Sequence, residues 1–383
     1  MGRVLVVATA GAGGDLQPLM AAASALRDRG HELIVLGDRS VERSLAGLKM
    51  KTEVLPPELD LGPALGGAIR DAMAAADGDL VTAGPIVQER MATWADDVSG
   101  PVARAVETHR PDALVTSLFG VEALHKAEPP CPWVVVNSTF YVGPDPPRPV
   151  AFDFGPRALP LIERYASLLA SPDLVLHATD PAFDLSLEGL PERHHYVGPL
   201  GIWEPPSGRP SYLDEAGDPW VLVSISSQMQ DDVPIAEAAL DAMEDRPVRV
   251  LLTLGPDHTA AELSNVPPDA RVEQVISHSA VLGYATLLVS HAGHGSVMKA
   301  LWYGCPMVLI PGGRDQPGVA TRAAALGVAE IVPREGASAA AIGEAVARVL
   351  EDTGMRQKAA WHAARLRSTD PPGVAAALIE GLL

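Results

Sequence analysis

The segment that decides the fold spans residues 291–316 and reads HAGHGSVMKALWYGCPMVLIPGGRDQ. An apolar, strand-like run at residues 285–290 precedes it, and a second apolar run lies within it at residues 307–310. Between the two runs, Gly293 opens and Gly304 closes a predicted helix. The order strand, glycine-rich turn, helix, strand and loop predicts an α/β domain with a parallel sheet.

The first turn of this predicted helix is suited to bind phosphate. A helix start with glycines exposes unpaired backbone N–H groups and the positive end of the helix dipole. The loop after the second strand adds the carboxylate of Asp315 and the amide of Gln316, which suit sugar hydroxyls. A diphosphate site beside a site for hydroxyls predicts a nucleotide sugar as the ligand. The residues assigned to the diphosphate in this segment are His291, Gly293, His294, Gly295 and Ser296.

Simpler interpretations of the segment remain open at this point. Ser296 can cap an ordinary turn between a strand and a helix, and Asp315 can fix a polar surface loop. His291 and His294 have a spacing that could hold a metal ion, but no third ligand lies near them in sequence. We therefore expect no metal here.

The arrangement resembles the nucleotide-sugar signature of GT-B glycosyltransferases, specifically the family-1 enzymes of actinobacterial natural-product (antibiotic) pathways and of plants. The resemblance covers nearly the whole chain and implies an α/β fold of two Rossmann-like, doubly wound domains that face a cleft. It also implies an inverting transfer of a sugar from a nucleoside-diphosphate sugar to a hydroxyl of a natural-product aglycone. A TDP-deoxysugar is the favoured donor and UDP-glucose the second, with no cofactor besides this co-substrate.

The chain is expected to divide into four parts, because 383 residues are many for a single core. Residues 1–203 are predicted to form a Rossmann-like domain that binds the acceptor. Residues 204–219, rich in proline, form the linker. Residues 220–358 form the domain that binds the nucleotide sugar. By resemblance, residues 359–383 form a helical tail that packs back on the first domain.

A second motif, GAGGDLQPL at residues 11–19, is the candidate site of the catalytic base. Many members of the family carry Gly-His-x-x-Pro here, with the histidine as general base. Aligned on Gly14 and Pro18, Asp15 takes the place of that histidine, as in a subset of antibiotic glycosyltransferases. A carboxylate there can accept the proton of the acceptor as it attacks C1 of the sugar. Asp15 could instead cap a helix, and Ser117 stands where histidine-based relatives carry a partner aspartate.

Further donor residues follow from the resemblance. Ser227 comes after the first strand of the second domain and is expected near the diphosphate, while Val275, Ile276 and His278 are expected to frame the nucleobase. Lys299 stands where many relatives have a glutamate that accepts the ribose hydroxyls. Because an ammonium group has no acceptor, this exchange fits a thymidine donor, whose sugar lacks one hydroxyl.

Acceptor recognition is expected in irregular stretches of the first domain. Loops of this kind set ligand choice on a rigid scaffold. The aromatic residues assigned to the acceptor are Phe119, Phe140 and Tyr141.

Composition excludes several other classes of protein. A net charge of −19 argues against binding of nucleic acid, which needs a basic surface. No apolar run reaches 18 residues, so no membrane-spanning helix is expected. With only Cys131 and Cys305, no disulfide framework is expected and a cytoplasmic setting fits. The expected partners are a nucleotide sugar and a small-molecule aglycone, and the sequence leaves open a homodimer.

Three other functions were weighed against a glycosyltransferase. A nicotinamide enzyme would need a glycine where Leu16 ends the Gly-x-Gly-x-x pattern. A UDP-sugar 2-epimerase would need clustered carboxylates beyond Asp15 and Asp315. A catalytically silent, glycosyltransferase-like auxiliary protein would need neither the Asp15 motif nor the segment at residues 291–316, yet both are present.

Overall fold

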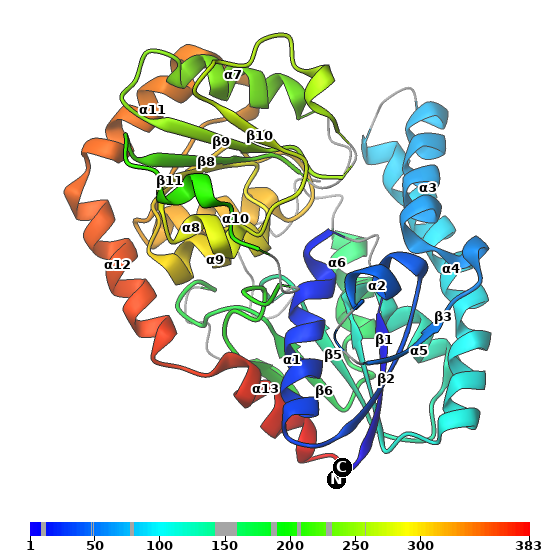
Figure 1. The fold of residues 1–383 in the computed structure, drawn as a ribbon. Coiled ribbons are helices and arrows are strands. Elements are labelled where there is room, and N and C mark those ends of the chain that lie inside the picture. Colours follow the sequence, from blue (N-terminus) through cyan, green and yellow to red (C-terminus); the bar gives the residue numbers. More distant parts are fainter. Residues whose placement is uncertain are drawn as a thin grey trace.

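The computed structural model describes residues 1–8, 13–46, 48, 50–76, 80–141, 159–184, 190–204, 208–226, 232–256 and 258–383. Two α/β domains, each built on a parallel sheet, lie one above the other (Figure 1). The predicted strands at residues 285–290 and 307–310 are confirmed, the second of them one residue shorter. The glycine-rich turn between them leads into a helix that ends at Gly304, as predicted.

The N-terminal sheet has the order β3-β2-β1-β4-β5-β6-β7, and all its neighbouring strands are parallel. Its strands are β1 (Arg3–Ala8), β2 (Glu32–Gly37), β3 (Lys51–Val54), β4 (Ala113–Ser117), β5 (Trp133–Asn137), β6 (Leu174–His177) and β7 (His194–Tyr196). The helices are α1 (Leu16–Asp28), α2 (Arg39–Ser44), α3 (Leu61–Ala75), α4 (Leu80–His109), α5 (Val121–Ala127) and α6 (Leu159–Leu168).

The C-terminal sheet has the order β10-β9-β8-β11-β12-β13 and is also parallel throughout. Its strands are β8 (Trp220–Ser224), β9 (Arg249–Thr253), β10 (Arg271–Glu273), β11 (Ala285–Ser290), β12 (Met307–Leu309) and β13 (Ala329–Ile331). The helices are α7 (Val233–Met243), α8 (His278–Leu282), α9 (His294–Tyr303), α10 (Gln316–Ala325), α11 (Ala339–Glu351), α12 (Thr353–Arg367) and α13 (Pro371–Glu380).

Each sheet is buried on both faces, which explains why its strands read as continuous apolar runs. In β1, Val4 and Val6 pack on the side of α1, while Leu5 and Val7 pack on the side of α4. Successive side chains of a strand point to opposite faces, so one short strand serves two cores. The same alternation in β8 serves the two cores of the C-terminal domain.

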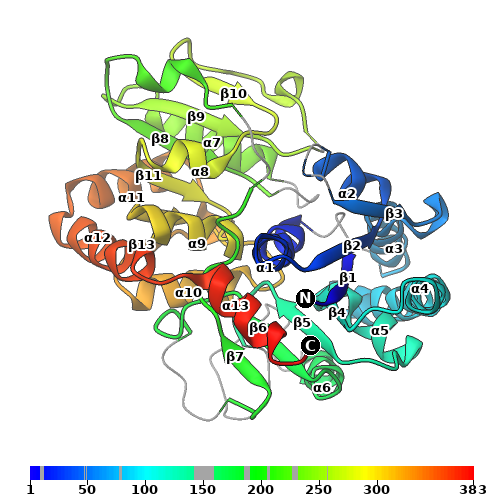
Figure 2. The same ribbon diagram turned by 60° about the horizontal axis from the view of Figure 1, so that its bottom comes forward.

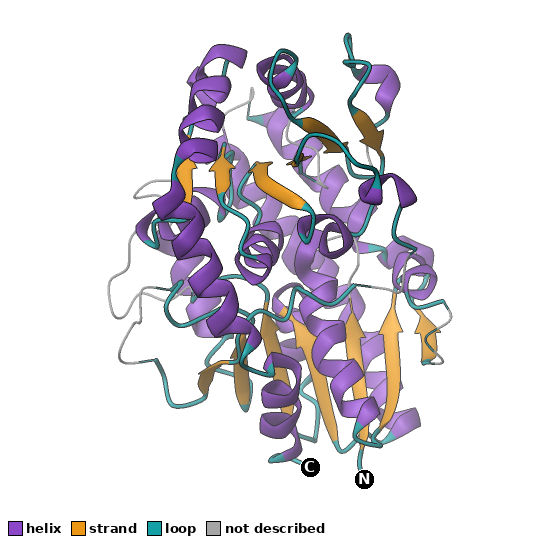
Figure 3. Ribbon diagram, turned by 60° about the vertical axis from the view of Figure 1, so that its left-hand side comes forward, coloured by secondary structure: helices purple, strands orange, loops and turns teal. Residues whose placement is uncertain are grey.

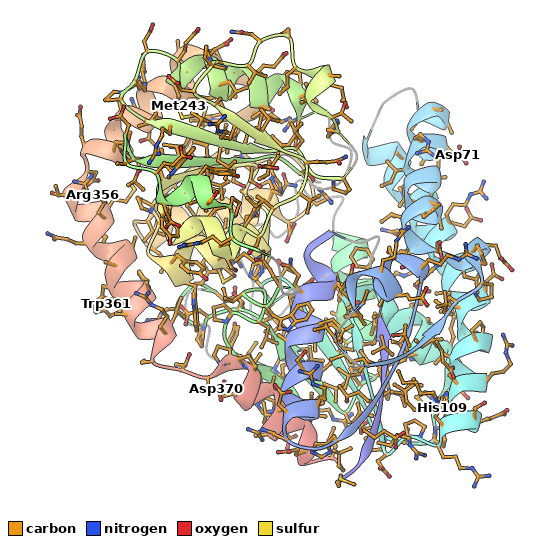
Figure 4. The ribbon with its side chains drawn as sticks, viewed as in Figure 1. Asp71, His109, Met243, Arg356, Trp361 and Asp370 are labelled. Atoms are coloured by element: carbon orange, nitrogen blue, oxygen red, sulfur yellow. The ribbon has the colours of Figure 1, made fainter. Side chains whose placement is uncertain are left out.

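The chain returns to its first domain at its end. Helix α12 packs beside α9, and α13 packs beside α1 at the end of the molecule that carries both termini (Figure 2). Arg29 and His31 both bind Glu380 of α13. Figure 4 shows Trp361 on the outer side of α12 and Asp370 where the chain enters α13. The tail contacts the N-terminal domain through α13 and also through Arg365 near the end of α12, which pairs with Asp180.

The carboxyl ends of the N-terminal strands point toward the other domain (Figure 3). Ligand sites in open α/β sheets lie outside these ends. Residues of the N-terminal domain near these ends meet the C-terminal domain, as Gln17 does at Lys299 and Thr139 at Asp315. The contact is partly apolar, because Phe140 and Phe183 of the first domain belong to the buried core of the second.

Candidate active site

Asp15 lies where a single 3₁₀ turn (η1, Gly13–Asp15) meets α1, and 2% of its surface is exposed. The hydroxyl of Ser138 donates a hydrogen bond to Oδ1 over 2.6 Å. Asp15 holds the N-cap position of α1, but its side chain accepts no hydrogen bond from the helix backbone. The second oxygen, Oδ2, is buried and has no hydrogen-bond partner in the described part of the chain. The structure therefore does not support the alternative that this carboxylate serves to cap the helix.

The surroundings of Asp15 raise the pKa of its carboxyl group toward neutral pH. Burial raises the pKa of Asp15 to about 6, and the hydroxyls of Ser117 and Ser138 and the backbone of Phe119 oppose that rise. Ser117 lies at the end of β4 and is fully buried, but neither it nor Phe119 reaches Oδ2 in hydrogen-bond geometry. A carboxyl group with such a pKa can accept a proton in one step and release it in the next.

On the side of the C-terminal domain, the turn before α9 holds His291 in one orientation. Its Nδ1 lies 3.2 Å from the carbonyl oxygen of Ser224, so Nδ1 carries the proton that is donated. In the neutral ring Nε2 is then an acceptor, and it can donate to a phosphate only from the imidazolium. Burial lowers the pKa of His291, and the carboxylate of Asp232 opposes this. A Cβ on Gly293 would lie 2.5 Å from this Nε2, which explains the glycine.

His294 is placed differently from the prediction. Its Nε2 lies 3.2 Å from the hydroxyl of Thr179 in the N-terminal domain, and its ring meets Phe183 edge to face. Burial lowers the pKa of His294 to about 4, so the ring is neutral. The side chain is thus engaged between the domains, and only the backbone N–H of His294 is left to serve a diphosphate.

Gly295 and Ser296 leave the first turn of α9 open. A Cβ on Gly295 would meet nothing within 4 Å. Ser296 is half-buried, and its hydroxyl makes no hydrogen bond to the residues that the structure describes. The helix is capped by Gly293 without a side-chain bond, so its first N–H groups face no carboxylate or hydroxyl cap. Among the described residues, this end of α9 presents backbone N–H donors without a side-chain cap, the arrangement that binds anions at helix starts.

Asp315 and Gln316 lie at the start of α10. Oδ2 of Asp315 accepts a hydrogen bond from the hydroxyl of Thr139 over 2.8 Å, across the boundary between the domains. Gln316 is buried, and its Oε1 accepts from the backbone N–H of Gly312 over 2.8 Å. Arg314, with φ 63°, donates to the hydroxyl of Ser226 and so fixes the loop before the helix. These contacts fix the conformation of the turn before α10, so the segment is not an unconstrained polar loop.

The two candidate acids are thus held by adjacent residues. Ser138 binds Asp15 and Thr139 binds Asp315, although the acids belong to different domains. Neither Ser138 nor Thr139 was among the predicted site residues. Their place directly after β5 was the available signal, because the carboxyl ends of parallel strands line ligand sites.

Lys299 is 4% exposed and is not directed at open space. Its ammonium donates to Oε1 of Gln17 over 2.9 Å and to a carboxylate oxygen of Glu204. The other oxygen of Glu204 accepts from the hydroxyl of Ser277 and from the backbone N–H of Ser279. The counter-ion of Lys299 is therefore a carboxylate from the predicted linker, and this pair was not foreseen.

The three residues assigned to the nucleobase lie together at the start of α8 but differ in exposure. Val275 is 70% exposed, whereas Ile276 packs against the core of the C-terminal domain. Nε2 of His278 lies 3.1 Å from the hydroxyl of Thr253. Burial and the nearby ammonium of Lys299 lower the pKa of His278 to about 4, so this ring is neutral.

Two of the three residues assigned to the acceptor, Phe140 and Tyr141, are buried, and their assignment is corrected here. Phe140 is 0% and Tyr141 5% exposed, so neither offers a surface to an aglycone. Phe140 lies instead under Arg322, whose guanidinium carbon is 3.8 Å from the ring centroid. Phe119 is half-buried beside the Asp15 site and is still a candidate. Ser227, assigned to the diphosphate, lies outside the described residues.

Within the residues that the structure describes, no group of three or more histidine, cysteine, aspartate or glutamate side chains is arranged to hold a metal ion. Nor does that part of the chain contain a helix long and apolar enough to cross a membrane.

Comparison with known proteins shows that the chain is similar to glycosyltransferases of antibiotic pathways. Residues 237–380 match the family model of the erythromycin biosynthesis protein CIII-like C-terminal domain. Demethyllactenocin mycarosyltransferase of Streptomyces fradiae is 32% identical over 209 residues, which cover 52% of this chain and 43% of that protein. 4'-Demethylrebeccamycin synthase of Lentzea aerocolonigenes is 31% identical over 235 residues, covering 59% and 54%. The chain therefore aligns with about half the length of these curated relatives.

Solved structures match over the full length. The glycosyltransferase of kitacinnamycin superposes with a TM-score of 0.75 at 20% identity, covering 100% of this chain and 99% of that one. Spinosyn rhamnosyltransferase SpnG in complex with thymidine diphosphate gives a TM-score of 0.71 at 19% identity and covers 100% of both chains. The expected fold is confirmed: the chain has the GT-B architecture of two Rossmann-like domains.

Proposed function

We propose that this protein is an inverting glycosyltransferase that moves a sugar from a nucleoside-diphosphate sugar to a hydroxyl of a natural-product aglycone, with Asp15 as general base. One observation carries the proposal. A buried carboxylate of the N-terminal domain and an acid at the start of α10 are held by adjacent residues, Ser138 and Thr139. The proposed proton acceptor and the proposed sugar-binding acid are thus both held by one turn, although they belong to different domains.

The chemistry follows from this arrangement. The oxygen of the acceptor hydroxyl attacks C1 of the donor sugar, and its proton passes to Oδ2 of Asp15. The bond between C1 and the phosphate oxygen breaks, and its electron pair leaves with the nucleoside diphosphate. The N–H groups at the start of α9, with Ser296, stabilise the charge on the departing diphosphate. Because attack and departure occur on opposite faces of C1, the anomeric configuration inverts.

A TDP-deoxysugar is the favoured donor, and UDP-glucose is second. One support is Lys299, which stands where a glutamate binds ribose hydroxyls in many relatives. Another is the kind of sugar named for the similar proteins: a mycarosyltransferase, a 6-deoxyallosyltransferase and a rhamnosyltransferase with bound thymidine diphosphate. Glu204 places a carboxylate beside Lys299, so the preference has to be measured on nucleotides directly. The proposal requires no cofactor or metal.

The test is the thermal stability of the full chain with millimolar TDP, UDP or NAD. A ligand at 100 times its Kd stabilises the folded state by about 2.7 kcal/mol, which raises the melting temperature by a few degrees. We expect a larger rise with TDP than with UDP and none with NAD. The absence of a rise with either diphosphate would refute the donor site. Binding without transfer to any hydroxylated aglycone would support an auxiliary protein instead.

A further inference from the structure

Residues 137–141, which follow β5, form a tight turn that is shaped by a buried side chain. Nδ2 of Asn137 donates to the carbonyl oxygen of Phe140 over 2.9 Å, and its Oδ1 accepts from the backbone N–H of Thr139 over 3.3 Å. Asn137 is fully buried and is itself held by Nδ1 of His177 at 2.9 Å. The geometry of Ser138 and Thr139, at the tip, is therefore set from within the N-terminal domain.

On one side the turn fixes Asp15. A serine hydroxyl has a single proton to donate, and Ser138 gives it to Oδ1 over 2.6 Å. That bond makes Oδ1 the less basic oxygen and fixes the plane of the carboxylate. Oδ2, which is buried without a partner in the described part of the chain, is the oxygen left to take a proton.

On the side of the C-terminal domain, α10 contacts the turn at two places. Thr139 binds Asp315 at the start of the helix. Seven residues later, on the same face of α10, Arg322 lies over the ring of Phe140 at 3.8 Å and pairs with Asp184 over 2.9 Å. Asp184 in turn accepts from the backbone N–H of Tyr141 over 2.9 Å.

The second of these contacts is buried, and further hydrogen bonds support it. Neither side chain of the Arg322–Asp184 pair is exposed to solvent. The hydroxyl of Tyr196 donates to the same carboxylate over 2.7 Å. A buried ion pair keeps the geometry in which its two charges meet, because separating them would leave an unpaired charge in the interior at a high cost in free energy. The turn therefore cannot shift without α10, and α10 cannot shift without the turn.

We propose that Ser138 is a positioning residue that orients the carboxylate of Asp15 for proton transfer, and that the turn at residues 137–141 ties this orientation to α10 of the donor domain. The inference rests on the proposed role of Asp15 as the base. The start of α10 and the base are then connected through one turn, so a change at either contact of the turn is expected to alter the orientation of the base.

The test compares Ser138→Ala with Ser138→Thr, which restores a hydroxyl, and with Ser99→Ala, which removes a hydroxyl from the remote surface of α4. The readouts are the pH profile of kcat, the KM for the donor and the melting temperature with TDP. Loss of a donor to the charged carboxylate favours its protonated form. We expect the acid limb of Ser138→Ala to move upward by about one pH unit, with kcat about tenfold lower on that limb. Its donor KM and TDP response stay unchanged.

Ser138→Thr is expected to bring the acid limb back, and Ser99→Ala to leave it in place. A folded Ser138→Ala protein with the native pH profile would overturn the inference, and so would a parallel loss of TDP binding. If Ser138→Ala does not fold, Thr139→Val serves as the second test. It is expected to lower kcat with the midpoint of the acid limb unchanged, and native kcat would count against the coupling. Failure of the native protein to bind TDP, by contrast, would refute the proposed function itself.

Discussion

The ammonium of Lys299 on α9 is paired with the carboxylate of Glu204, and their side chains are only 5% and 11% exposed. Burial opposes the charged form of Glu204, but Lys299 and the hydroxyl of Ser277 outweigh it and lower the pKa of this carboxyl. The pair joins the linker to the donor domain. Gln17 extends it into α1 of the N-terminal domain.

Glu204→Gln is therefore expected to destabilise the protein by about 3 kcal/mol, because it leaves a buried ammonium without its counter-ion. Urea unfolding at pH 7 measures the change. Asp214→Asn is the matched control, since it breaks the exposed pair with Arg209 nearby in the sequence, and it should cost less than about 1 kcal/mol. Equal effects of the two substitutions would contradict a stabilising role for the buried pair.

The same pair predicts a dependence of stability on pH. A carboxyl whose folded pKa lies below its unfolded pKa contributes its stability above the unfolded value and loses it as the pH falls through the folded one. The difference in unfolding free energy between the native protein and Glu204→Gln should therefore shrink when the pH is lowered from 7 toward 3. A constant difference over that range would show that the effect of the substitution is not electrostatic.

Ser296 lies in the first turn of α9 and Ser338 at the N-cap of α11, and substitutions of the two are expected to have opposite effects. Ser338 caps α11 by accepting from the backbone N–H of Ala341. Ser338→Ala should cost about 1 kcal/mol of stability and leave TDP binding intact. Ser296 caps nothing. Ser296→Ala should keep the stability and weaken TDP binding about tenfold, the usual value of a hydrogen bond to a charged group. Calorimetric titration and urea unfolding separate the two effects, and TDP binding by Ser296→Ala at native strength would remove this hydroxyl from the donor site.

Asp15→Asn is expected to stabilise the protein at neutral pH. Burial raises the pKa of Asp15 from its ordinary value of 3.8 to about 6. A raised carboxyl pKa means that the folded state binds the proton more tightly, so this group costs stability as the pH rises from about 4 to about 6. At about 1.4 kcal/mol per pKa unit, the cost at pH 7 is about 3 kcal/mol. Asparagine carries no charge and so avoids this cost. Urea unfolding should show that Asp15→Asn is more stable than the native protein at pH 7 but not at pH 4. A loss of stability at pH 7 would show that the charge is well compensated.

Much of the fold could be predicted from the sequence, because strands buried on both faces read as apolar runs and glycine marks the helix ends. The start of α9 followed from such local signals. The single helix α4 did not, because Pro85 and Pro101 lie inside it and proline usually interrupts a helix. Tertiary packing of Trp94, Val98 and Val102 against the sheet overrides that preference.

The site was predicted less completely, because its remaining parts are contacts between residues far apart in the chain. Glu204 reads as a linker residue until the fold places it against Lys299, 95 residues later. Phe140 reads as a loop aromatic until the second domain covers it. The direction of the His294 ring depends in the same way on Thr179. Sequence periodicity reports which residues are buried within an element, not which element will cover them.

The turnover of Asp15→Asn decides whether Asp15 is the base of a sugar transfer. Release of TDP from a TDP-deoxysugar is followed with a panel of hydroxylated aglycones, alongside the Kd for TDP. We expect asparagine to lower turnover by roughly 100-fold or more, the usual contribution of a positioned base, and to leave the Kd for TDP unchanged. Turnover of Asp15→Asn close to that of the native protein would remove Asp15 from the mechanism.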